Sequence, residues 1–470
     1  MAERDRLLVR GFTDPRDKLR GQFATRVRMF LMINADLWPL AASQPQMMLE
    51  GATCKIAAVR WIFRRDEEKS RRSRPSQAWC FCENHQSNQD ANMPLRATLT
   101  NSWDHIQGFL FPMLRREVGP LTAQHERLVV VLDMARIEAL VQAWPGLPGR
   151  PPEDRHALAR AFVAKAVLDL PTTAGLIERL AVDAALRRLC GWERASEVPS
   201  ESTFSRAFAE FSDSSLPSLV HEALIKKAYK DQIVGHISRD ATAIEVREKP
   251  VKEVPAIAKT PKRKRGRPKK GEVVPDKEPR RLERQVGQTL ADMLAELPIL
   301  CNVGTKKNAK GYKTSWIGYK LHIDTADGDV PITCLLTSAS VHDSQVALPL
   351  ATITAERVTN LYDLMDSAYD VLEIRTKSMA LGHVPIIDHK TRRGEKAAIE
   401  AEARAKRRAG YELAEDVRYN QRSSAERVNG NLKDNCGGNH VRVRGAAKVF
   451  CHLMFGILVV TVEQLMRLVT

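Results

Sequence analysis

The period of the apolar residues changes near residue 232, and this change constrains the fold more than any other feature. Between residues 121 and 231 apolar positions recur about every 3.6 residues, which predicts amphipathic helices. The segment 232–246 (QIVGHISRDATAIEV) instead alternates and is rich in Ile, Val and Thr, as buried strands are. Later segments continue in the order β-β-β-α-β-α-β-α. We therefore predict an α/β protein, with a mixed sheet flanked by helices after an all-helical N-terminal domain.

Composition suggests where the domains begin and end. Residues 1–92 contain Arg-rich pieces without sustained periodicity, and we interpret them as a loosely folded arm or an N-terminal extension. Residues 93–231 are predicted to form the helical domain. Residues 232–470 are predicted to form the α/β domain, with a basic, disordered insertion at about 247–310.

The chain is strongly basic, with 73 Lys and Arg against 57 Asp and Glu, a net charge of +16 and a pI near 9.5. Such a balance indicates a polyanionic partner, most often nucleic acid. The eight cysteines are scattered, which favours a reducing, intracellular compartment. No signal peptide is predicted at the N-terminus. The apolar run near 453–469 is interrupted at Glu463 and is interpreted as a core element rather than a membrane span.

Residues 259–270 (KTPKRKRGRPKK) form the most basic stretch of the chain, with eight Lys or Arg among twelve residues and no acidic residue. Proline and like-charge repulsion predict a solvated loop. Its RGRP sequence resembles an AT-hook, in which arginines enter a narrow minor groove. A general phosphate-binding loop, or one that only solvates the chain, is the alternative. The candidate DNA contacts here are Arg265, Arg267, Lys269 and Lys270.

A short helix predicted over residues 199–212 is a second candidate DNA contact. It would carry three phenylalanines on one side and Arg206 on the other. A short helix after a turn, with exposed Ser and Arg, fits the second helix of a helix-turn-helix motif. A small helical bundle would show the same pattern.

Three acidic residues stand out by their positions. Asp240 lies in the middle of an apolar strand, Asp366 ends a later strand, and Glu426 lies in a late helix. A carboxylate within a buried strand is costly unless something compensates its charge, and a bound cation is one such compensation. Carboxylates that converge at a sheet end suit Mg²⁺ or Mn²⁺. Each residue taken alone is more often a helix cap or an ion-pair partner.

The late helix, predicted over residues 414–438, strengthens this hypothesis. Tyr419, Arg422, Glu426 and Lys433 fall within an arc of about 60° at 100° per residue. One helix face would thus carry a carboxylate, two cations and a phenol. Arg and Lys grip phosphates and Tyr donates a hydrogen bond or stacks, so this face would suit a site that holds a metal and DNA.

These residues resemble bacterial insertion-sequence transposases of the DDE type with a Tyr-Arg-Glu-Lys signature. The spacing from Tyr419 to Lys433 matches the late helix of that family, and Asp240 and Asp366 look like its first and second acidic residues. The resemblance covers about residues 199–470. It implies a ribonuclease-H-like core that cuts and joins DNA strands without a covalent enzyme–DNA intermediate. By resemblance the partners are terminal inverted repeats and target DNA, bound by a homodimer in the bacterial cytoplasm at the nucleoid.

The mechanism expected on physical grounds uses two Mg²⁺ ions, which Mn²⁺ would replace. Asp240 would bridge both ions, Asp366 and Glu426 would complete one shell each, and Arg422 and Lys433 would hold the DNA backbone. Asp343 is expected near this site because its turn lies at a sheet end. Two other hypotheses remain: a non-catalytic DNA-binding protein, such as a domesticated transposase, and a nuclease on the same fold.

Overall fold

A computed structural model of the protein describes residues 95–142, 152–251, 279–307, 311–389 and 394–470, all within one compact unit. Two predictions lie outside the described residues. One is the arm or extension over residues 1–92. The other is the basic stretch 259–270, with Arg265, Arg267, Lys269 and Lys270.

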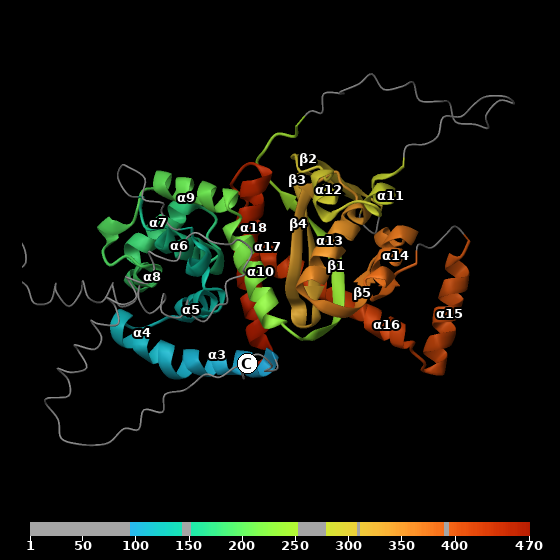
Figure 1. The fold of residues 1–470 in the computed structure, drawn as a ribbon, viewed down its shortest axis with the longest axis horizontal. Helices are drawn as coiled ribbons and strands as arrows, with labels where there is room; N and C mark the ends of the chain where they lie inside the picture. Colours follow the sequence, from blue (N-terminus) through green and yellow to red (C-terminus); the bar gives the residue numbers. More distant parts are fainter. Residues whose placement is uncertain (1–94, 143–151, 252–278, 308–310, 390–393) are drawn as a thin grey trace, which may run out of the picture. The chain divides into compact units, whose positions relative to one another are not determined.

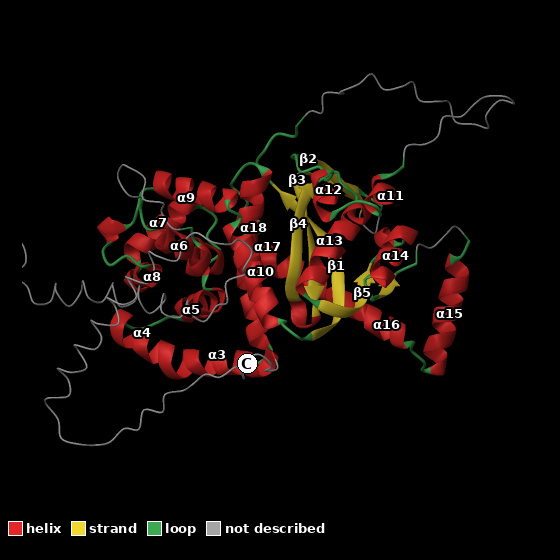
Figure 2. Ribbon diagram, in the orientation of Figure 1, coloured by secondary structure: helices red, strands yellow, loops and turns green. Residues whose placement is uncertain are grey.

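The first part of the described chain is helical, as the 3.6-residue period predicts (Figures 1 and 2). The helical period that begins at residue 121 is interrupted early: α5 ends at Ala135, because Arg136 takes a left-handed conformation with φ 45°. A 3-10 turn, Ile137–Leu140, follows. The helices are α3 (Leu95–His105), α4 (Phe111–Val118), α5 (Ala123–Ala135), α6 (Arg155–Val167), α7 (Thr173–Val182), α8 (Ala184–Cys190), α9 (Glu201–Asp213) and α10 (Leu216–Ala228).

The α/β part is a six-stranded mixed sheet with helices on both faces, as predicted (Figure 2). Strand β1 is central: it pairs antiparallel with β3 and parallel with β5, while β5 pairs parallel with β6. Strands β2 and β4 both pair antiparallel with β3. The strands are β1 (Ile233–Glu245), β2 (Asn302–Lys307), β3 (Lys313–Ala326), β4 (Val330–Ser338), β5 (Thr359–Met365) and β6 (Val384–Ile387).

The predicted insertion over 247–310 differs from the structure at its C-terminal end. Residues 279–307 contain α11 (Arg281–Gln285), α12 (Leu290–Ala295) and strand β2. Leu282 and Met293 are buried against the apolar residues of α13 (Ala347–Arg357) and of β5. The charge and proline content of the preceding basic stretch obscured these short elements, whose apolar residues find partners only in the folded sheet.

The end of the chain forms α18 (Ala446–Arg467), which is long and apolar enough to cross a membrane by length and composition. Most of it is buried inside the protein, however, which agrees with its interpretation as a core element. It packs on α5, α6, α9 and α10 of the helical part and on β4 of the sheet (Figure 1). In its middle, Phe455 meets Phe162 of α6 and Phe208 of α9. One apolar core therefore joins the helices to the sheet.

Candidate active site

Asp240 and Asp366 lie on the same face of two adjacent parallel strands. The β1–β5 register pairs Ser238 with Leu364, and each aspartate lies two residues further along its strand. Side chains two residues apart point to the same face, and adjacent strands lie about 4.8 Å apart. Asp366 follows β5 directly and its Oδ1 accepts a hydrogen bond from the Ala368 amide (3.0 Å). The two predicted acidic residues therefore lie side by side on one face of the sheet, Asp240 within β1 and Asp366 just after the end of β5.

The late helix covers this face in three pieces rather than one: α16 (Ala414–Tyr419), a 3-10 turn (Asn420–Arg422) and α17 (Ser423–Asn435). The turn contacts β1 directly, since the Ser238 hydroxyl donates to the Gln421 carbonyl at 3.4 Å. Further along, Asn429 Nδ2 donates to Asp240 Oδ2 at 3.1 Å. The continuous helix assumed for the 60° arc is thus broken between Tyr419 and Ser423.

Despite that break, Tyr419, Arg422 and Glu426 remain close to one another. Arg422 Nη2 donates to Glu426 Oε1 at 2.7 Å, and the Arg422 guanidinium lies 5.9 Å from the centre of the Tyr419 ring. The Glu426 side chain is 55% exposed and turned to Arg422. Within the described ranges, no three His, Cys, Asp or Glu side chains are gathered tightly enough to hold a metal ion. In this arrangement Glu426 is paired with Arg422 rather than gathered with the aspartates.

The pKa shifts show that the charges of Asp366 and Glu426 nevertheless act on Asp240. Burial raises the pKa of Asp240 to about 6, and the negative charges of Asp366 and Glu426 add to this shift while Arg422 opposes it. Burial also raises the pKa of Asp366, again against Arg422. An acidic site whose charge is not balanced by its own residues favours a cation.

Lys433 lies on the same side of the sheet as Asp240, and Arg206 does not. Burial lowers the pKa of Lys433, and its electrostatic neighbours include Lys306, Glu245 and Asp240. Arg206 is exposed on α9 in the helical part, where its guanidinium donates to the Thr203 hydroxyl. Of the predicted DNA contacts, Lys433 therefore adjoins the acidic site and Arg206 belongs to a separate surface.

The structure places further residues at this site, most of which were not predicted from the sequence. Asn429 was missed, although its position three residues after Glu426 places it on the same helix face. Asp388, after β6, adds negative charge at Asp366. Asp343, expected near the site, also acts on Asp366 and accepts a 2.9 Å bond from Lys320. Tyr369 is 1% exposed, and its hydroxyl has no partner among the described residues.

The opposite face of β1 holds a paired charge instead. Arg239 donates to both carboxylate oxygens of Asp324, at 2.8 and 2.7 Å, and both side chains are almost fully buried. The Thr354 hydroxyl on α13 donates to the same carboxylate at 2.7 Å. This pair links β1, β3 and α13 beneath the acidic site.

Acidic side chains on neighbouring strands of a mixed sheet, below a helix with basic residues, are typical of enzymes that act on phosphodiesters. Comparison with family models identifies which one. Residues 236–462 match the family described as "Transposase DDE domain", and residues 119–210 match "Transposase domain (DUF772)". The chain belongs to the insertion-sequence DDE transposases, which are metal-dependent enzymes that cut DNA and transfer its strands. Comparison with curated proteins and with solved structures found no match.

Proposed function

We propose that this transposase cuts and joins DNA at the ends of its own insertion sequence, with Asp240, Asp366 and Glu426 as its catalytic carboxylates. The observation that supports this most is the common face and register of Asp240 and Asp366 on adjacent strands. The field that both share with Glu426 adds to it. Tyr419, Arg422, Glu426 and Lys433 are proposed as the Tyr-Arg-Glu-Lys signature.

The residues at this site fit a hard divalent cation. Carboxylate and amide oxygens are the ligands that Mg²⁺ prefers, directly or through its waters. Asn429 Oδ1 is buried beside Asp240 and has no partner among the described residues, so an acceptor is available for a cation's water. The raised pKa of Asp240 falls back when a positive charge arrives. We propose Mg²⁺ as the natural ion, with Mn²⁺ as a substitute and with two ions per site.

Bound ions would polarise the scissile phosphate and activate the attacking hydroxyl. The chain's own residues would do the rest. Asp240 and Asp366, fixed on rigid strands, would set where the phosphate lies. Arg422, once released from Glu426, would hold a phosphate oxygen, and Lys433 would hold the backbone further along. Tyr419 would position the strand beside them.

Nicking of supercoiled plasmid DNA carrying the element ends tests this proposal. Asp240→Ala should abolish Mg²⁺-dependent nicking while gel-shift binding of the ends persists. Asp434→Asn changes an exposed carboxylate on the same helix as Glu426 and should leave both activities unchanged. Loss of nicking and binding together would make Asp240 structural. Nicking by no form of the protein would favour the non-catalytic DNA-binding alternative, and cutting without joining of paired ends would favour a nuclease.

We also propose how the protein meets DNA. Arg206 on α9 and the basic stretch 259–270 would contact the terminal inverted repeats or the target. Each phosphate contact contributes about −0.9 to the slope of log K against log salt, so deleting 259–270 should flatten that slope. An unchanged slope would exclude the stretch from the interface.

Joining two ends implies that two copies act together, so we propose a homodimer on DNA. We place the protein in the bacterial cytoplasm at the nucleoid. The mass of the complex with paired ends, measured by light scattering, tests the stoichiometry: one chain per pair of ends would contradict the dimer.

A further inference from the structure

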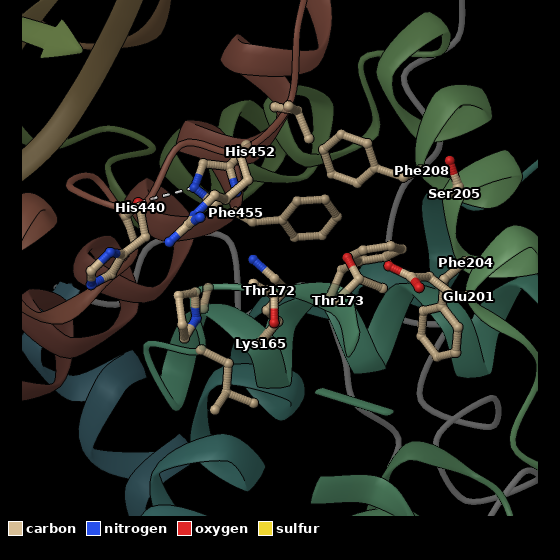
Figure 3. Close-up of a pocket in the computed structure, with 17 residues that line it drawn as sticks. Lys165, Thr172, Thr173, Glu201, Phe204, Ser205, Phe208, His440, His452 and Phe455 are labelled. Carbon is tan, nitrogen blue, oxygen red and sulfur yellow. Dashed lines mark hydrogen bonds between the residues drawn. The ribbon is translucent and has the colours of Figure 1, made fainter. Parts of the chain in front are cut away.

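A cavity of about 340 Å³ lies in the helical part, away from the carboxylates (Figure 3). Its walls come from the end of α6, the start of α7, one face of α9 and the segment that joins α17 to α18. Four of its lining residues can carry positive charge, from two distant parts of the chain: Lys165, His440, Arg442 and His452.

Two of these side chains have no direct partner. Among the described residues, neither the Lys165 ammonium nor the Arg442 guanidinium forms a hydrogen bond or an ion pair. Burial lowers the pKa of Lys165 to about 8, against the attraction of Asp169. An ammonium group held in a partly enclosed cavity without a partner is costly, and an anion would compensate it.

The framework around Lys165 is built from specific contacts. Gly437 donates its amide to Asp169 Oδ1 at 2.8 Å, which fastens the α17–α18 segment to the turn between α6 and α7. His452 Nε2 donates to the Gly437 carbonyl at 3.0 Å. Burial lowers the pKa of His452 to about 4, so its ring is neutral near pH 7. The segment that carries Arg442 is therefore held beside Lys165.

The rest of the wall suits an anion rather than a metal. Thr172 caps α7 by accepting a hydrogen bond from the Gly175 amide at 3.0 Å, and the remaining N–H groups of this turn and the Thr173 hydroxyl favour an anion. Phe204 and Phe208 form an apolar wall that keeps water away and strengthens the attraction. In Figure 3, Glu201, the one carboxylate among the described residues that line the cavity, lies on the Phe204 side, and Lys165 lies on the His452 side.

We propose that this cavity binds a phosphate group of the DNA backbone, held by Lys165 and Arg442. The proposal rests on the proposed function, because it makes the cavity a second anchor for DNA, remote from the acidic site. A backbone phosphate fits better than a free one because the same segment continues into exposed Arg444 and Lys448. α9, which supplies the aromatic wall, also carries Arg206. A DNA phosphate bound in this cavity would thus contact both the helical part and the segment that follows α17.

The test measures DNA and phosphate binding separately, in EDTA, so that failure of the metal site does not affect the result. Fluorescence anisotropy with a short mixed-sequence duplex, over a salt series, compares the wild type with Lys165→Gln and Arg442→Gln. Arg116→Gln, which changes an exposed arginine of α4 that does not line the cavity, is the matched control. Thermal shift with inorganic phosphate, at constant ionic strength, gives the second measurement. Arg442 is exposed, so its variant is expected to fold.

We expect each cavity variant to weaken duplex binding roughly tenfold and to reduce the salt slope by about 1. Phosphate should stabilise the wild type and Arg116→Gln, but neither cavity variant, and it should compete with the duplex. If phosphate binds without competing, the cavity holds a free phosphate compound and the DNA assignment is wrong. If neither ligand distinguishes the cavity variants from Arg116→Gln, the cavity is not a phosphate site.

Discussion

The two faces of β1 differ in how the charge of a buried carboxylate is compensated. Arg239 and Asp240 are consecutive residues, so their side chains point to opposite sides of the sheet. On one side, Asp324 is compensated by Arg239 through two hydrogen bonds. On the other, Asp240 accepts hydrogen bonds from the Asn429 side chain and the Ala241 backbone, while burial and the charges of two more carboxylates outweigh the effect of Arg422 enough for its pKa to stay raised. Asp324 is thus directly paired, whereas Asp240 is only partly compensated and is available for chemistry.

Breaking the paired face should have the largest effect. Arg239→Met leaves Asp324 buried without its partner, which should lower the free energy of unfolding by about 3–5 kcal/mol. The double change Arg239→Met and Asp324→Leu should recover most of this loss, because no charge is then left alone. Urea unfolding of both variants measures it. Arg427→Gln breaks an exposed pair with Asp329 and should cost under about 1 kcal/mol. Equal losses for Arg239→Met and Arg427→Gln would contradict the role of burial.

The hydrogen bond from Asn429 to Asp240 on the acidic face gives the next effect. Asn429→Ala removes the bond to Asp240, and loss of such a supporting contact should lower metal-dependent nicking roughly 10–100-fold. More Mg²⁺ should be needed for half-maximal nicking, whereas duplex binding in EDTA should not change. Asn435→Ala, at an exposed position of the same helix, is the control. Nicking at the wild-type rate would remove Asn429 from the site.

The raised pKa of Asp240 predicts a pH-dependent difference in stability. The folded pKa of about 6 exceeds the ordinary aspartate value of 3.8, so the folded state holds the proton more tightly. Wild-type stability should therefore fall as pH rises from about 4 to about 6, relative to Asp240→Asn. Thermal unfolding should show the variant more stable at pH 7.5 and equal to the wild type at pH 4.

Mg²⁺ sharpens the same comparison. Mg²⁺ should raise the unfolding temperature of the wild type at pH 7.5. The rise should be smaller at pH 5, because protons then compete with the ion for Asp240. Mg²⁺ should have little effect on the unfolding temperature of Asp240→Asn. Equal shifts for the two proteins at pH 7.5 would place the ion elsewhere.

The smallest effect is expected from Arg422. Its pair with Glu426 is partly exposed, so Arg422→Gln should change the free energy of unfolding by less than about 1 kcal/mol. Duplex binding should weaken with a salt slope lower by about 1, since one phosphate contact is lost. A loss of stability well above 1 kcal/mol, with an unchanged slope, would make Arg422 a structural residue.

The sequence predicted an element correctly where local interactions determine its conformation. Alternation over 232–246 predicted β1, observed at Ile233–Glu245. Local sequence was a poor guide where a short element depends on distant partners, as with β2, which is defined by pairing with β3. The late helix shows both outcomes, because its residues are helical but the turn at Asn420–Arg422 follows from contact with β1.

The candidate site divides in the same way. Asp240, Asp366 and Glu426 could be selected from their positions in predicted elements and from the resemblance. Asn429 and Asp388 could not, since amides and aspartates at loops and on helix surfaces are common and carry no local signal of a site. Their importance comes from lying beside Asp240 and Asp366 after folding.

By itself, the sequence determined the kinds of element, their order and the excess of positive charge, because periodicity and composition are local properties of a chain. Only the tertiary structure decided which carboxylate is neutralised and which is left to attract a cation. That outcome depends on burial and on distances of a few ångströms between groups far apart in sequence, such as Arg239 with Asp324 and Asp240 with Asn429. Coulomb energies depend on those distances, and no local pattern contains them.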